Sequence, residues 1–191
     1  MVAVERLEDL IQVGPLVPGG TEAERRAAFE RFTQERLERA YRLAGVILRD
    51  RSEAEDAVHD AAMRAWLHWA ELREPERLDA WFDRIVVHEC RARLRRRMIR
   101  ALPLADRADP TGPDAFGGVV ERDVLSRTLA TLDADHRIAV VLRYVAQLTP
   151  AEIALRTGAR EGTVKSRLHY ALRQMRAALE AADRTSAGGP R

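Results

Sequence analysis

The chain has one cysteine in 191 residues, Cys90, and it has no long apolar run. A single cysteine excludes an internal disulfide and a zinc site built from several cysteines, and it is typical of a reducing compartment. No apolar stretch approaches the roughly 18 to 20 residues of a membrane-spanning helix. The N-terminus is acidic and contains proline, unlike the basic start and apolar core of a signal peptide. These absences predict a cytoplasmic protein without membrane insertion.

The residue combinations of common catalytic sites are also missing. His88 and Glu89 begin the zinc motif H-E-x-x-H, but Ala92 stands where the second histidine is required. The chain has no glycine-rich loop that cradles phosphates, and its motifs assemble no nucleophile with a base and an orienting group. An enzyme is therefore the weaker hypothesis. We expect no catalytic residue, no metal site and no cofactor.

Charged residues make up 32% of the chain, and their signs are segregated although the net charge is only +2. Six arginines crowd residues 91–100, whereas five carboxylates crowd residues 50–60. Such a pattern offers a basic face for phosphates and an acidic face for a basic protein partner. The same pattern also fits ordinary solvated helix faces, so it requires support from motifs.

Apolar residues recur at helical spacing along most of the chain, and no segment alternates in the manner of a β-strand. We therefore predict an all-α fold of two small helical domains joined by a flexible linker. Capping boxes at Thr21 with Glu24 and at Ser52 with Glu55 predict the starts of two helices, and Pro75 separates the second helix from a third. The predicted organisation is an N-terminal extension over 1–24, a helical domain over 25–100, a linker over 101–118, a second helical domain over 119–181 and a flexible tail over 182–191.

Residues 149–169 have the pattern of a helix-turn-helix. Thr149, Pro150 and Glu152 suit the first turn of a helix, and Gly158 can adopt the left-handed conformation that ends it. A second helix follows, with an apolar face that starts at Val164 and a polar outer face that is free to enter a DNA groove. An ordinary helical hairpin is the alternative. The residues predicted on or beside the outer face are Thr163, Lys165, Ser166, Arg167, His169, Tyr170 and Arg173.

Three stretches carry a family resemblance: EDAVHDAAMRAWL over 55–67, DAWFDRIVVHECRARLRRR over 79–97, and the helix-turn-helix region over 132–172 with its string GTVKSRL. Through them the chain resembles the extracytoplasmic-function (ECF) group of bacterial sigma factors. The resemblance implies that the chain binds core RNA polymerase, directs promoter recognition and helps to open the DNA. It leaves open whether an anti-sigma factor is a further partner.

The resemblance also implies roles for individual segments. The first stretch resembles the helix that docks on the clamp coiled coil of polymerase, the second the helix that contacts the downstream promoter element, and the third the domain that binds the upstream element. The loop over 72–79 lies where the family captures an unstacked promoter base. The implied polymerase contacts are Asp56, Val58, Asp60, Met63 and Trp66, and the implied downstream-element contacts are Arg84, His88, Arg91, Arg93, Arg95, Arg96 and Arg97.

Three positions depart from the family pattern. His88 stands where many members have asparagine, Tyr170 where arginine is usual, and Arg160 where a proline or small polar cap is frequent. These departures bear on base preference rather than on the class of function. The alternative within DNA-binding proteins is a helix-turn-helix regulator that does not act as a sigma subunit, and the stretch over 55–67 argues against it.

Overall fold

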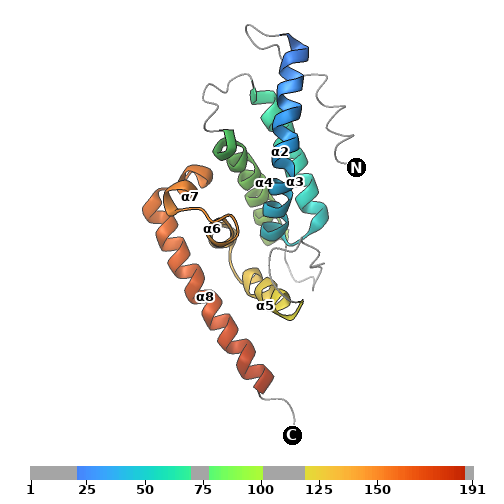
Figure 1. The fold of residues 1–191 in the computed structure, drawn as a ribbon. Helices are drawn as coiled ribbons and strands as arrows, with labels where there is room; N and C mark the ends of the chain where they lie inside the picture. Colours follow the sequence, from blue (N-terminus) through green and yellow to red (C-terminus); the bar gives the residue numbers. More distant parts are fainter. Residues whose placement is uncertain (1–20, 70–77, 101–118, 188–191) are drawn as a thin grey trace.

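The computed structural model describes residues 21–69, 78–100 and 119–187, and all regular elements in these ranges are helices (Figure 1). The all-α prediction is therefore confirmed. Predictions for the extension up to residue 20, for residues 72–77 of the base-capture loop, for the linker and for residues 188–191 lie outside the described residues. The helices are α2 (Glu22–Leu48), α3 (Arg51–His68), α4 (Leu78–Arg100), α5 (Val119–Ala130), α6 (Ala134–Tyr144), α7 (Pro150–Thr157) and α8 (Glu161–Ala187).

Helices α2, α3 and α4 pack on one another and form the first half of the molecule. An aromatic cluster joins the three helices near the start of α2. Phe29 lies 5.2 Å from Trp66 and Phe32 lies 5.2 Å from Phe82, measured between ring centroids. Edge-to-face contacts of this kind stabilise a core beyond the area that they bury.

The start of α2 agrees with the sequence, whereas the start of α3 does not. Thr21 and Glu24 form the predicted capping box. Asp50 caps α3 by accepting a hydrogen bond from the backbone N–H of Glu53, which corrects the predicted box at Ser52. The chain turns at Arg49, whose φ of 57° is left-handed, so the next helix begins two residues earlier than its serine suggested.

Helices α5 to α8 form the second half, and α7 with α8 make the helix-turn-helix (Figure 1). The caps of α7 match the prediction: Thr149 and Glu152 form a capping box, and Gly158 ends the helix with φ of 69°. Helix α8 continues to Ala187, past the predicted start of a tail at residue 182. Its later turns project away from the other helices, and Leu172 and Leu179 are 40% and 39% exposed. The predicted apolar face of α8 is thus buried only near its start.

The two halves dock on one another. Helix α4 packs against α6 and α7, and α2 packs against α6. Arg137 of α6 is half-buried at this junction and donates a hydrogen bond to the carbonyl of Ile47 at 3.4 Å. Burial, together with the nearby charges of Arg49 and Arg97, lowers the pKa of Arg137 to about 10. Its guanidinium therefore stays charged at neutral pH.

None of the helices in the described ranges is long and apolar enough to cross a membrane.

Candidate protein and nucleic-acid interfaces

The acidic side of α3 forms a stripe of exposed and half-exposed residues. Asp56, Asp60 and Met63 follow one another at helical spacing, and Leu67 continues the stripe with 53% of its surface exposed. Asp60 also binds the guanidinium of Arg93. The stripe therefore combines carboxylates at one end with apolar groups at the other. This is a suitable composition for an interface with a basic protein surface.

Two residues predicted for this contact lie in the core instead. Val58 is fully buried and Trp66 is 4% exposed, which corrects their assignment to a contact surface. The apolar and acidic faces of α3 adjoin, so periodicity alone did not distinguish residues that pack in the core from residues that contact a partner. Leu67 was missed, although its position four residues after Met63 on the same face would have identified it.

The arginines of α4 divide between two faces. Arg93 pairs with Glu89 at 3.1 Å and also with Asp60, while Arg97 pairs with Asp50 at 3.0 Å and Glu53 at 3.2 Å. Both guanidinium groups are thus satisfied within the first half. A DNA contact by either residue would have to replace ion pairs that hold α3 and α4 together, and their assignment to DNA phosphates stays a prediction.

The opposite face of α4 presents Arg84, His88, Arg91 and Arg95 at helical spacing. Arg84, His88 and Arg95 are exposed, as is Arg96 beside them. This face borders a cleft of about 380 Å³ between α3, α4 and α7. Among the described residues, four guanidinium groups and no carboxylate line the cleft. Its lining residues are Arg64, His68, Trp81, Arg84, Ile85, His88, Arg91, Arg156 and Thr157.

Two acidic residues of α4, whose structural role the sequence did not predict, join α4 to the neighbouring helices. Asp83 is 5% exposed and accepts hydrogen bonds from Arg39 of α2 at 3.0 Å and Arg156 of α7 at 2.8 Å. Glu89 is 2% exposed and pairs with Arg64 at 3.0 Å in addition to Arg93. Glu89 is therefore a buried structural carboxylate. Within the described ranges, no group of three or more histidine, cysteine, aspartate or glutamate side chains could hold a metal ion.

The outer face of α8 is exposed as predicted. Thr163, Lys165, Ser166, His169, Tyr170 and Arg173 are all exposed. The rings of His169 and Tyr170 lie edge to face with centroids 5.6 Å apart, so each restricts the other. Lys165 pairs with Glu161 at 2.7 Å.

Two basic residues near this face behave differently from the rest. Arg167 is half-buried and donates to Asp135 of α6 at 2.8 Å, which removes it from the freely available face. Arg160 occupies the N-cap position of α8, because the N–H of Val164 donates to its carbonyl at 3.1 Å. An arginine side chain has no acceptor for the remaining N–H groups of the first turn.

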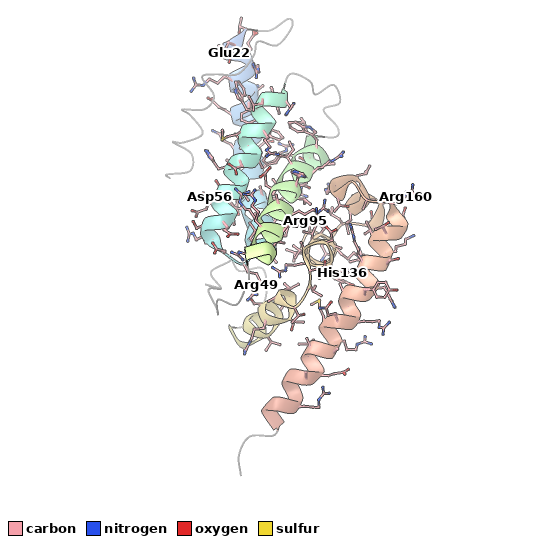
Figure 2. The ribbon with its side chains drawn as sticks, turned by 180° about the vertical axis from the view of Figure 1, so that it is seen from behind. Glu22, Arg49, Asp56, Arg95, His136 and Arg160 are labelled. Carbon is pink, nitrogen blue, oxygen red and sulfur yellow. The ribbon has the colours of Figure 1, made fainter. Side chains whose placement is uncertain are left out.

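The faces lie apart in space. Figure 2 shows Asp56 on the outer side of α3 and Arg160 at the turn between α7 and α8 on the opposite side of the molecule. Arg95 lies between them on α4, on the side that approaches α6.

Comparison with known proteins identifies the family. Residues 32–111 match the family model of sigma-70 region 2, and residues 122–175 match that of sigma-70 region 4. The ECF RNA polymerase sigma factor SigL of Mycobacterium tuberculosis H37Rv is 32% identical over 146 residues, which are 74% of this chain and 80% of SigL. The chain belongs to the ECF sigma factors. It therefore acts as a sigma factor that directs transcription initiation, and the regulator alternative is not favoured.

Other relatives of this sigma factor agree. The RNA polymerase sigma-E factor of Streptomyces coelicolor is 29% identical over 155 residues, covering 81% of this chain and 88% of the relative. The sigma factor RpoE of Bartonella quintana, solved with the anti-sigma factor NepR, has a TM-score of 0.63 and 26% identity, and the match covers 79% of this chain and 98% of that one. CnrH, solved with the cytosolic domain of CnrY, matches in fold with a TM-score of 0.60 and 20% identity over 92% of this chain and 95% of CnrH.

In this sigma factor the region 2 match contains most of α2, all of α3 and all of α4, whereas the region 4 match ends at residue 175 within α8. The basic cleft thus lies between a region 2 face and the first helix of the region 4 helix-turn-helix.

Proposed function

We propose that the stripe of Asp56, Asp60, Met63 and Leu67 on α3 binds core RNA polymerase. Its carboxylates attract a basic partner and accelerate encounter, while Met63 and Leu67 supply apolar area that water leaves on binding. Val58 and Trp66 do not contact polymerase in this proposal; they pack α3 against the core and so support the stripe. The separation of this stripe from both basic faces supports the proposal, because one protein can then contact polymerase and DNA together.

The α4 face with Arg84, His88, Arg91, Arg95 and Arg96 contacts the downstream promoter element. Guanidinium groups bind phosphates and provide salt-dependent affinity without sequence choice. His88 is the residue on this face that is suited to discriminate bases, since an imidazole can donate or accept a hydrogen bond.

The exposed face of α8 reads the upstream element. Arg173 contacts phosphates, while His169 and Tyr170 touch base edges or a thymine methyl group in the major groove. The protein itself catalyses no reaction, because polymerase does the chemistry, and it acts in the cytoplasm. An anti-sigma factor is a further partner, because the related RpoE of Bartonella quintana was solved with the anti-sigma factor NepR.

The observation that carries this proposal is the presence of three charged faces on three helices of one small protein. The test mixes core polymerase with wild type, Asp56→Arg or Glu161→Arg and measures by size-exclusion chromatography how much of each protein elutes with polymerase. Glu161 is an exposed carboxylate on α8, away from the proposed contact. We expect a smaller fraction of Asp56→Arg than of wild type to coelute with polymerase, and Glu161→Arg to coelute as wild type does. Equal coelution of both variants would contradict the assignment of α3.

A further inference from the structure

Two carboxylates join the two halves, and one of them, Asp135, pairs with arginines that were predicted to contact DNA. Asp135 of α6 pairs with Arg91 of α4 at 2.8 Å and with Arg95 at 3.7 Å, and it accepts a hydrogen bond from Arg167 of α8 at 2.8 Å. One carboxylate thus gathers cations from the helices of both proposed DNA faces. Arg91 also donates to the carbonyl of Thr157 at 3.2 Å, at the C-terminal end of α7 where a cation is favoured.

The second link is the pair of Asp83 and Arg156. The two side chains are 7% and 9% exposed, so the pair is nearly free of solvent and is screened little by salt. It places α7 over the basic face of α4. Arg84 also approaches the end of α7, because a Cβ at Gly158 would lie 3.6 Å from its Nη2 atom.

We propose that Asp83 and Asp135 form an internal latch: the Asp135 carboxylate stands in for DNA phosphates, and the pair of Asp83 with Arg156 holds α7 over the α4 face. In the docked state they hold Arg156, Arg91 and Arg95, and α7 covers the α4 face. Promoter phosphates compete for the same guanidinium groups, since carboxylate and phosphate oxygens accept the same forked pairs of hydrogen bonds. The part of this inference that concerns DNA rests on the proposed function of α4 and α8.

The latch is built to open without leaving a buried charge unpaired. Asp83 keeps Arg39 of its own half when Arg156 departs, and Asp135 keeps Arg167 of its own half when Arg91 and Arg95 depart. An uncompensated buried carboxylate would strongly oppose opening. The second partner in each half removes that obstacle.

The test measures the distance between the halves in the full chain, without polymerase. Spectroscopic labels are placed on Glu38→Cys of α2 and Arg160→Cys, both at exposed positions, while native Cys90 is fully buried. We expect one short distance for the otherwise wild-type chain, and a longer, broader distribution for Asp83→Asn with Asp135→Asn. Arg156→Gln should also separate the two halves, and it leaves Asp83 paired with Arg39. This variant therefore replaces the double variant in the measurement if the double variant fails to fold.

A 40-base-pair mixed-sequence DNA duplex is the second probe. If the open state holds about a tenth of the wild-type molecules, opening the latch raises affinity for this duplex about tenfold. Glu161→Gln is the matched control, because it removes an exposed carboxylate at the start of α8 without touching the junction. It should leave the distance unchanged and raise affinity by much less.

Three results would each overturn the latch. The label distance in the latch variants could equal that of wild type, or the wild-type chain could already show the long distance. The variants could also open without any gain in affinity for the DNA duplex. Failure of the wild-type chain to bind polymerase would instead contradict the proposed function, and the distance measurement would stand.

Discussion

The guanidinium of Arg25 lies over the indole ring of Trp66, 4.0 Å from the ring centroid, and donates to the Trp66 carbonyl at 3.2 Å. The two side chains are 3% and 4% exposed, and they join the start of α2 to the end of α3. A buried cation–π contact of this kind is worth about 2 kcal/mol when it is desolvated. Trp66 is therefore a core residue, whereas its neighbour Leu67 is exposed.

The first prediction separates these two neighbours. Trp66→Ala should lower the free energy of unfolding by about 3–5 kcal/mol, because it leaves a cavity against Phe29 and Arg25. Leu67→Ala should change it by no more than about 0.5 kcal/mol, as is usual for exposed positions. Urea unfolding followed by circular dichroism measures both. Equal stabilities would show that Trp66 does not support the core as described.

The second prediction concerns the polymerase stripe. Asp56→Arg combined with Leu67→Asp should weaken binding to core polymerase at least tenfold, about 1.4 kcal/mol, with little effect on stability. Asp60→Arg is a poorer probe, because it would place a second cation against Arg93 and loosen α3 from α4. Fluorescence anisotropy with labelled protein provides the affinity, and Glu38→Arg on α2 is the control. An unchanged affinity in the folded double variant would reject the stripe.

The third prediction concerns the reading face of α8. His169→Ala and Tyr170→Ala should each cost about 1–3 kcal/mol on the preferred upstream element and relax preference at one or two positions. Tyr170→Arg should increase preference for guanine. Selection from duplexes with a randomised upstream element measures these preferences. Identical base preferences in wild type and the three variants would mean that this face of α8 does not read the DNA sequence.

The fourth prediction distinguishes two arginines beside that face. Arg173 is exposed, so Arg173→Ala should weaken binding to all sequences and reduce the salt slope by about one. Arg167 is held by Asp135, so Arg167→Ala should change the slope by less. Titrations at several salt concentrations report both slopes. The same loss of slope for both would mean that Arg167 leaves Asp135 to bind DNA.

The fifth prediction concerns Cys90, whose burial raises the pKa of the thiol from 9.0 to about 12. Because the thiolate is the reactive form, a disulfide reagent at pH 8 should modify Cys90 only as fast as the protein unfolds. The unfolded chain releases this proton first, so the free energy of unfolding should fall as pH rises from 9 toward 12. Cys90→Ala should show a smaller pH slope over this range. Rapid modification of the native protein would contradict the burial.

Local signals in the sequence predicted local structure well. The capping box of Thr149 with Glu152 and the left-handed Gly158 depend on residues within one helix and its turn, and the structure confirms both. The start of α3 shows where such signals compete. Asp50 and Ser52 are both suitable caps, and the left-handed turn at Arg49, which no sequence rule favours, decides for Asp50.

The arrangement of charges was less predictable, because it depends on partners that are distant in sequence. The run of arginines on α4 suggested one basic face, but Arg93 and Arg97 lie four residues apart on the side that meets α3, while Arg91 and Arg95 lie on the side that meets α6. The pair of Asp83 and Arg156 spans 73 residues and joins the two halves. No spacing rule reaches that far.

Transcription in vitro tests whether this protein directs initiation at promoters. Core RNA polymerase is incubated with genomic DNA fragments, with or without this protein, and the 5′ ends of the transcripts are sequenced. We predict that the protein creates a set of discrete start sites that share upstream and downstream elements, and that His169→Ala with Tyr170→Ala weakens or redistributes them while polymerase binding is kept. Start sites identical to those of core polymerase alone would contradict a role of this protein in promoter recognition.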